Sequence, residues 1–585
     1  MARAKVITAT NEILVKNGFV FDPASGVNGD VKDIAVQNGK IVEASKLTTG
    51  AKVIDARGKV VMAGGIDPHT HIAGPKINVG RLYRPEDKLH DPAMISSSKL
   101  LRAGGGFSVP STFATGYRYA TLGYTMANEA AMPPLLARHT HEEIRDTPII
   151  DQSAFTLLGN NWLAMEYIKR GETEKLDAFI AWMLKATKGS VVKLVNPGGT
   201  EAWGWGKNCL SIDDPVPYFD VTPRDIIKGL AGANERLGLP HSIHVHANNL
   251  GNPGNYTTLL QTLALTEGLR TNKKSGRQQN MHVTHAQFNC YGGTTWKDFE
   301  SKASVIADYV NSHDHLTLDA GFVTLDETTT MTADGPFEHH LSSLNHLKWA
   351  NLDVELETGS GIVPFIYDPK NHVFGIQWAV GLELALLVKD PMKCFMTTDH
   401  PNAGPFTRYP VVTSWLMSKK ARDEKMASLH KWVPERTTLG GISRELSFYE
   451  IAAMTRAGPA KALGLGKKKG SLAPGADADI AVYSFNPKTT DATQRPEVLV
   501  RALERAAYTI KGGEIVVKDG EVVSIGTTKS VFWTDADGFD NKEVVNDVVD
   551  KFLKYYSVTL NNYPVQESYL VNPTVLKAGP LAGGA

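Results

Sequence analysis

The chain has only three cysteines among 585 residues, which is too few for a disulfide framework or a four-thiolate iron–sulfur cluster. We therefore expect Cys209, Cys290 and Cys394 to be reduced and either buried or incidental. An excess of charge of one sign is also lacking, because 62 Lys and Arg residues balance 62 Asp and Glu residues. This balance gives no electrostatic reason to expect nucleic acid or an anionic membrane as a partner.

Long apolar runs are missing as well. The first ten residues, MARAKVITAT, lack the apolar core of a signal peptide, and no segment reaches about 18 uninterrupted apolar residues. We therefore predict a cytoplasmic protein. The chain is longer than one compact core can serve, so roughly two to four domains are expected.

Short strands separated by turns are predicted at both ends of the chain, because β-branched residues cluster there between Gly, Asn and Asp. The N-terminal group covers residues 14–22, 33–36, 40–43 and 52–55. The C-terminal group covers residues 480–484, 507–511, 514–518 and 521–525. We predict that residues 1–60 and 466–525 together form one small β-sandwich domain.

The middle of the chain, residues 61–465, alternates apolar strands with helical patterns such as those at residues 257–270 and 374–389. Eight such repeats predict an α/β fold of the closed (β/α)8, TIM-like barrel type. The predicted barrel strands are residues 61–71, 106–113, 150–158, 190–195, 242–246, 281–286, 316–323 and 393–398. Residues 324–369 are predicted to be an insertion. The tail, residues 526–585, carries aromatics and is expected to pack on the barrel or on partner subunits.

Two histidines close the first predicted barrel strand. His69 and His71 are two residues apart, so their side chains point to the same face of an extended chain. Two imidazoles on one face can bind a single zinc-like ion. Taken alone, a structural pair of hydrogen-bonded histidines is an equally good interpretation.

Further ligand-type residues stand at the ends of later strands. Lys193 ends the fourth strand among Val and Leu residues, where a buried ammonium needs a partner. Reaction with carbon dioxide would turn its amine into a carbamate, which is an oxygen ligand able to bridge two cations. Alternatively, its ammonium reaches an exposed rim. His246 and His285 end the fifth and sixth strands, whereas His244 and His282 are better explained as hydrogen-bonded core imidazoles.

Asp399 ends the eighth predicted strand in the segment TTDHPN. A carboxylate at this place can bind a metal and take a proton from metal-bound water. A turn or a helix cap is the alternative for the residue taken alone. The order His-x-His, Lys, His, His, Asp on successive strand ends favours a metal site over separate structural explanations.

The same order, together with several local motifs, resembles the amidohydrolase superfamily in the branch of dihydroorotases, hydantoinases and ureases. The motifs are GKIV at residues 39–42, VIDARGKVVMAGGIDPHTH at 53–71, GPAKALGL at 458–465 and KGSLAPGADADI at 469–480. The residues that match the family's ligands are His69, His71, Lys193, His246, His285 and Asp399. The resemblance implies that the first two bind one metal, that the lysine is carboxylated at its side-chain nitrogen and bridges both metals, and that the next two bind the second metal. The aspartate would be a ligand and the general base, and the metals are expected to be two zinc ions.

A closer resemblance is to the family of A-type subunits of formylmethanofuran dehydrogenases, in particular its members in the formyltransferase/hydrolase complexes of methylotrophic bacteria. The supporting segments are GPKINVGR at residues 74–81, NPGG at 196–199 and WGWG at 203–206, whereas HANN at 246–249 departs from the HAEN of hydantoinases. The resemblance implies hydrolysis of N-formylmethanofuran, or of a methylofuran analogue, to formate and the free amine in one-carbon metabolism and formaldehyde oxidation. It also implies partner subunits, namely a formyltransferase and a redox-inactive subunit of the B type. Asn196 is expected to bind substrate.

Two other functions remain open at this point. One is hydrolysis of a cyclic amide, as in hydantoinases and dihydroorotases. The other is a catalytically silent scaffold with the amidohydrolase fold, although the presence of all six matching residues argues against it.

Overall fold

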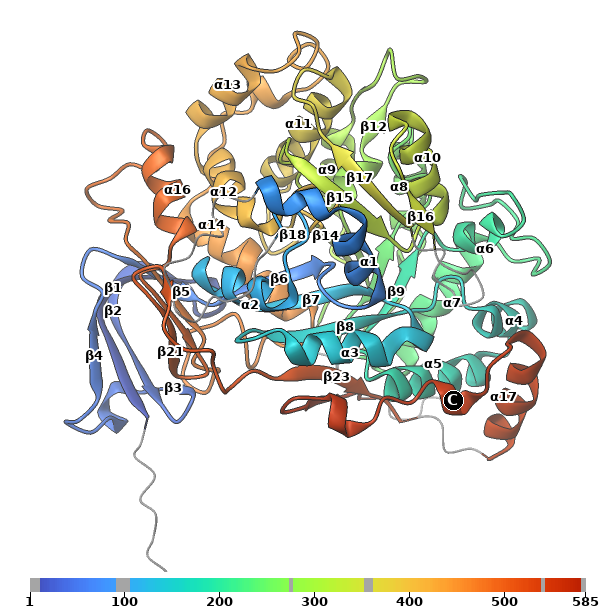
Figure 1. The fold of residues 1–585 in the computed structure, drawn as a ribbon, viewed down its shortest axis with the longest axis horizontal. Helices are drawn as coiled ribbons and strands as arrows, with labels where there is room; N and C mark the ends of the chain where they lie inside the picture. The colour runs from blue at the N-terminus through green and yellow to red at the C-terminus, as the bar shows by residue number, and fades with distance from the viewer. Residues whose placement is uncertain (1–10, 91–105, 273–276, 352–360, 538–541, 580–585) are drawn as a thin grey trace, which may run out of the picture.

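A computed structural model of the chain describes residues 11–90, 106–272, 277–351, 361–537 and 542–579. A barrel with its surrounding helices occupies most of the molecule, and a sheet built from both ends of the chain lies beside it (Figure 1). Among the residues described, no helix combines the length and the apolar character that crossing a bilayer requires.

Eight parallel strands form a nearly closed barrel, which confirms the predicted fold class. The strands are β6 (Gly65–Thr70), β7 (Tyr124–Met132), β8 (Asp151–Leu157), β9 (Val191–Val195), β10 (Ile243–His246), β11 (Met281–Val283), β14 (Leu316–Asp319) and β18 (Cys394–Phe395). The first and last strands approach each other through a bridge between Thr70 and His400. Because the strands run parallel, their carboxyl ends meet at one end of the barrel.

The predicted second strand, residues 106–113, is wrong. The backbone N–H and hydroxyl of Ser108 donate to the Asp87 carboxylate, and Ser111 then caps the helix α2 (Thr112–Thr121). The second barrel strand is instead β7, whose sequence YTMANEAAM shows no clean alternation because the strand is buried on both faces. The predicted first strand is also divided, since Val60–Ala63 belong to the other sheet and only Gly65–Thr70 belong to the barrel.

Helices surround the barrel strands (Figure 1). They are α2, α3 (Ala137–Asp146), α4 (Trp162–Arg170), α5 (Thr173–Thr187), α6 (Gly199–Trp203), α7 (Pro223–Arg236), α8 (Tyr256–Ala264), α9 (Ala303–Ser312), α11 (His372–Leu387), α12 (Tyr409–Met417), α13 (Lys419–Ala427), α14 (Phe448–Ala452), α15 (Gly458–Ala462) and α16 (Pro496–Glu504). Local signals explain their ends. Thr222 and Asp225 form a capping box at the start of α7, and Gly171 ends α4 with a positive φ of 66°.

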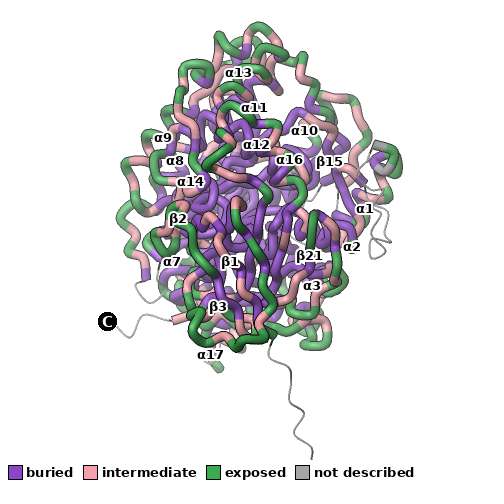
Figure 2. The backbone as a smooth tube through the Cα atoms, turned by 90° about the vertical axis from the view of Figure 1, so that its left-hand side faces the viewer, coloured by how far each residue is buried: buried purple, intermediate pink, exposed green. Residues whose placement is uncertain are grey.

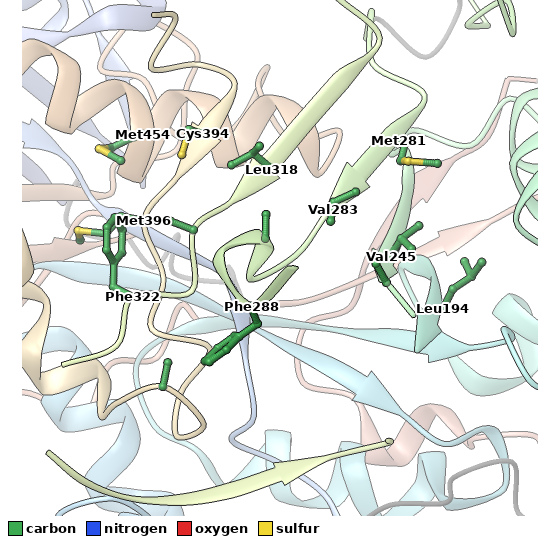
Figure 3. Close-up of a cluster of buried hydrophobic side chains, with 14 of the residues drawn as sticks. Leu194, Val245, Met281, Val283, Phe288, Leu318, Phe322, Cys394, Met396 and Met454 are labelled. Atoms are coloured by element: carbon green, nitrogen blue, oxygen red, sulfur yellow. The ribbon is translucent and has the colours of Figure 1, made fainter. Parts of the chain in front are cut away.

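Side chains alternate between the two faces of the barrel strands. Figure 3 shows Leu194, Val245 and Val283, which lie on β9, β10 and β11 within the apolar cluster that the covering helices share. The residues next to them in the chain, such as Lys193 and His244, belong to the opposite face and point into the barrel. Figure 2 shows that this interior is buried and that exposed residues lie on the outer helices and loops.

Strands from both ends of the chain form one continuous mixed sheet. Its members are β1 (Glu12–Asp22), β2 (Val27–Gln37), β3 (Lys40–Val42), β4 (Lys52–Asp55), β5 (Val60–Ala63), β19 (Ile480–Tyr483), β20 (Tyr508–Lys511), β21 (Glu514–Lys518) and β22 (Glu521–Val522). The two halves join where β5 pairs with β19 in antiparallel fashion. Apolar side chains of both halves, including Ile13 and Ile480, share one core cluster.

The insertion and the tail both pack on the barrel. The insertion, residues 324–369, contributes a small antiparallel sheet of β15 (Glu327–Thr332), β16 (Ala350–Asn351) and β17 (Gly361–Ile366), with α10 (Gly335–Asn345) between its strands and α1 (Pro75–Tyr83) beside it. In the tail, β23 (Val531–Asp535) runs parallel to β8, and β24 (Thr574–Lys577) pairs with β23. The tail helix α17 (Lys542–Tyr555) packs on α4 and α5.

Candidate functional site

The structure brings the six predicted ligand residues to the carboxyl end of the barrel. They are His69 on β6, His71 directly after it, Lys193 on β9, His246 at the end of β10, His285 after β11 and Asp399 after β18. None of these residues is more than 3% exposed. Ligand-type side chains from five strands therefore share one buried region.

The Asp399 carboxylate lies between the two histidines of the first strand. Its Oδ1 is 2.9 Å from Nε2 of His69 and 3.2 Å from Nε2 of His71. Neither Oδ1 of Asp399 nor Nε2 of His69 forms a hydrogen bond in spite of this proximity. The other oxygen, Oδ2, accepts from Nδ2 of Asn402 at 2.9 Å, and the Asp399 backbone N–H donates to the Thr397 hydroxyl at 3.0 Å. The aspartate is thus held from one side, and its free oxygen points at the imidazoles.

Lys193 is buried and its ammonium nitrogen has no hydrogen-bond partner. Burial lowers the pKa of this lysine to about 7, although the charge of Asp399 opposes the shift. The lowered pKa favours the neutral amine, which is the form that reacts with carbon dioxide.

The two later histidines complete the arrangement. The rings of His246 and His285 are 4.6 Å apart, and those of His69 and His285 are 5.4 Å apart. Potential ligand atoms of His69, His285 and Asp399 all lie within 4.8 Å of one another. His285 adopts a positive φ of 35°, and its backbone N–H donates to Asp319 at 2.6 Å.

The donor set fits a divalent cation. Five of its buried polar atoms have no hydrogen-bond partner, namely Nε2 of His69, Nδ1 of His71, Nζ of Lys193, Nδ1 of His285 and Oδ1 of Asp399. Each unpartnered buried group costs roughly 1–3 kcal/mol, so a cluster of them is costly unless something binds it. Imidazole nitrogens and carboxylate oxygens are the donors that zinc-like ions prefer.

Behind His69, polar side chains continue into the barrel. Its Nδ1 lies 2.8 Å from Nε2 of His244 and 2.5 Å from the Thr284 hydroxyl. The ring of His244 packs against that of His282, whose Nε2 is 3.0 Å from Oδ2 of Asp319. His244 and His282 are thus buried and hydrogen-bonded beneath the strand ends rather than at the cluster of unpartnered atoms.

Glu129 on β7 belongs to the site and was not among the residues predicted from the sequence. One of its oxygens accepts from the backbone N–H groups of Ile72 and Ala73, and the other accepts from Nζ of Lys76 at 2.8 Å and lies 3.4 Å from Nδ1 of His71. Burial tends to raise the pKa of Glu129, but the positive charge of Lys76 and the contact with His71 outweigh it and hold the pKa at about 2. The residue was missed because the second barrel strand, which carries it, was predicted at the wrong segment.

The insertion covers the site from above. A small cavity lies between His246 and Asp399 on the barrel side and Thr330, Phe337 and Tyr367 on the insertion side. A polar group of the insertion reaches the barrel as well, because Oδ2 of Asp334 is 3.0 Å from Nε2 of His246.

Asn196, the predicted substrate-binding residue, uses its amide within the protein. Its Nδ2 donates to Asn208 and to Asp334, each at 3.0 Å, and its Oδ1 accepts from Asn248 at 2.9 Å. Contact of this residue with a substrate stays a prediction.

Known proteins with similar sequences establish the family. The model of the amidohydrolase family matches residues 52–517, which is most of the chain. Protein FwdA of Methanocaldococcus jannaschii is 56% identical over 569 residues, which cover 97% of this chain and 99% of the relative. The chain belongs to the amidohydrolase family.

A second relative is itself a subunit of a multisubunit complex. The A-type subunit of the formyltransferase/hydrolase complex Fhc of Methylorubrum extorquens is 36% identical over 546 residues, covering 92% of this chain and 94% of the relative. The X-ray structure of the FhcABCD complex of that organism, with methylofuran bound, matches with a TM-score of 0.86 and 33% identity over 97% of this chain and 100% of the other. The resemblance predicted from the motifs is thereby confirmed.

Proposed function

We propose that the protein hydrolyses N-formylmethanofuran, or a methylofuran analogue, to formate and the free amine. The observation that carries this proposal is the convergence of unpartnered imidazole and carboxylate atoms around Asp399 at the carboxyl end of an amidohydrolase barrel. The choice of substrate is supported by the relatives, one of which belongs to a formyltransferase/hydrolase complex whose structure holds methylofuran.

Two divalent metal ions, expected to be zinc, would be held by six residues. His69 and His71 would bind the first ion, His246 and His285 the second, and Lys193, as its carbamate, would bridge both, with Asp399 as a further ligand. When bound, such ions polarise a carbonyl oxygen and lower the pKa of water.

The chain's own groups would then handle the proton. In the proposed reaction, water adds to the formyl carbon, and Asp399 accepts the proton that the water loses. The C–N bond breaks, the proton passes from Asp399 to the departing amine nitrogen, and formate and the amine leave. Asn402 holds the carboxylate by a hydrogen bond, and the Thr397 hydroxyl holds the backbone N–H of Asp399. Phe337 and Tyr367 above the site would exclude bulk water.

We further propose that the protein works in the cytoplasm as part of a larger assembly. We propose that its partners are a formyltransferase and a redox-inactive subunit of the B type, as the FhcABCD relative suggests. Such a complex would deliver the formyl group on its furan carrier and release formate as a step of formaldehyde oxidation.

The test is release of formate from a formylated furfurylamine by the purified full-length protein, with metal content measured on the same sample. Asp399→Asn keeps the size of the side chain and removes the proton acceptor. We expect turnover to fall by about 10³-fold or more while the metal content stays near two ions per chain. Wild-type turnover in this variant would contradict the proposed role of Asp399. Turnover of dihydropyrimidines instead of formamides would favour a cyclic-amide hydrolase, and a metal-free, inactive protein would favour a scaffold.

A further inference from the structure

We propose that Asp334, which lies in the insertion and outside the barrel, is the positioning residue for His246. It would orient that imidazole for the second metal ion and so make occupancy of this ion depend on the seating of the insertion. This inference rests on the proposed metal site, and the experiment below separates the failure of one from the failure of the other.

Asp334 lies between the insertion and two barrel strands. It follows β15 and caps α10, where its Oδ1 accepts from the backbone N–H of Phe337 at 3.2 Å. The same oxygen accepts from Nδ2 of Asn196, which follows β9, and Oδ2 accepts from Nε2 of His246 at the end of β10. The Asp334 carboxylate therefore connects the insertion to the ends of β9 and β10.

The surroundings of Asp334 make the contact with His246 energetically important. The side chain of Asp334 is only 3% exposed, and among the described residues its only ion-pair contact is His246. A buried carboxylate is costly unless hydrogen bonds and positive charge compensate it. Here the N–H groups of Phe337, Asn196 and His246 supply the hydrogen bonds. A cation bound to the far side of the imidazole would supply the positive charge.

The hydrogen bond also decides which nitrogen of His246 is free. When Nε2 carries the proton that it donates to Asp334, the lone pair lies on Nδ1. The carboxylate fixes this tautomer and the orientation of the ring, and it increases the basicity of the free nitrogen. Loss of such a carboxylate–histidine contact typically lowers metal affinity 10–100-fold.

Asp334 belongs to the insertion and not to a barrel strand. Its carboxylate therefore reaches His246 only when the insertion packs on the barrel. Two hydrogen bonds hold the insertion on the barrel. The Met331 backbone N–H donates to Asn402 at 2.7 Å, and the Thr200 hydroxyl donates to the Ala333 carbonyl at 3.1 Å. Whatever displaces β15 or α10 also withdraws Asp334 from His246. If packing of the insertion increases the affinity for the metal by some factor, metal binding at His246 must favour the packed insertion by the same factor.

The experiment measures metal binding in Asp334→Asn. Asparagine keeps the volume and the helix cap but lacks the charge, so α10 should remain folded. We expect the affinity of the second metal site, which His246 and His285 would form, to fall about 10–100-fold in competition with a chromophoric chelator, with the affinity of the first site unchanged. The Co²⁺-substituted variant should show an altered visible spectrum that corresponds to one ordered site. In formate release, kcat should fall while KM changes little.

The matched control is Asp326→Asn, which removes a carboxylate from the same insertion. Asp326 pairs with Arg408 at 2.7 Å and is not a hydrogen-bond partner of His246. This variant should keep two metal ions of wild-type affinity. If Asp334→Asn does not fold, Asp334→Ser is used instead. Its hydroxyl oxygen can still cap α10, but the serine side chain is too short to reach His246.

The possible results separate the two proposals. Wild-type affinity for both metals in Asp334→Asn, or equal metal loss in Asp326→Asn, would overturn the positioning role of Asp334. A wild-type protein that binds no metal under any condition would instead overturn the proposed function itself.

Discussion

Two buried lysines in this molecule have opposite surroundings. Lys193, at the carboxyl end of the barrel, is 1% exposed and its nitrogen has no partner. Lys469, where the barrel meets the mixed sheet, is 4% exposed, and its nitrogen lies 2.7 Å from Asp479 and 2.9 Å from Asp477 and also contacts Asp151. The two residues are buried to a similar extent, so the difference between them lies in their neighbours.

The neighbours move the two pKa values in opposite directions. Burial lowers the pKa of Lys193 to about 7. Burial would also lower that of Lys469, but the charges of Asp151, Asp479 and Asp477 outweigh it and raise the pKa well above its usual value. Lys511, 3.2 Å from Asp479, adds a second positive charge to that cluster. The charges around Lys469 thus compensate one another. The cluster around Lys193 instead has ligand atoms that need a cation and a lysine that can react with carbon dioxide.

The largest effect is expected at Lys193. Lys193→Ala removes the proposed bridge between the metals, so at least one ion should be lost and formate release should fall by about 10³-fold or more, equivalent to about 4 kcal/mol. Short carboxylic acids, which can supply a bridging oxygen pair, should restore part of the activity. Elemental analysis and the formate assay are the measurements. Two full metal sites in the variant would contradict the bridging role.

A smaller effect of a different kind is expected at Lys469. Lys469→Met leaves Asp477 and Asp479 with less compensation in a buried place, so the free energy of unfolding should fall by about 3 kcal/mol. Metal content and kcat of the folded variant should be unchanged, because the cluster lies at the opposite end of the barrel strands.

The pH dependence provides a further check on Lys469. Folding raises its pKa, so its stabilising contribution is fully present below the pKa of the unfolded chain and is lost only as the pH rises through the folded value. The difference in denaturation midpoint between Lys469→Met and wild type should therefore stay constant from about pH 6 to about pH 9. A difference that disappears within this range would contradict the assigned charge state.

Residues at the ends of apolar strands could be predicted from the sequence, whereas residues that reach the site in other ways could not. The ligand candidates could be predicted because each follows an apolar strand, and parallel strands bring their carboxyl ends together. Glu129 could not be found in this way, since its strand is buried on both faces and its sequence lacks the expected alternation. Asp334 gave no signal either, because it lies in the insertion and meets His246 only through the packing of that insertion on the barrel.

Lys469 shows the limit of motif recognition. It begins the segment KGSLAPGADADI, which supported the family resemblance, yet nothing in that segment indicates that Asp151 of a distant barrel strand contacts it. Long-range pairing of charges depends on the closed fold rather than on sequence spacing. Only the structure could therefore show that this lysine is fully compensated and Lys193 is not.

The smallest effect is expected at Lys40, which contacts the same Asp477 from the surface. Its nitrogen is 2.5 Å from Oδ1 of Asp477, but the side chain of Lys40 is 49% exposed. Water and salt screen such a pair, so Lys40→Ala should lower the free energy of unfolding by less than about 1 kcal/mol, and less still at about 0.5 M NaCl. Denaturation at low and high salt, beside Lys469→Met, measures this. If Lys40→Ala cost as much as Lys469→Met, burial would not be what distinguishes the two partners of Asp477, and the comparison with Lys193 would lose its physical basis.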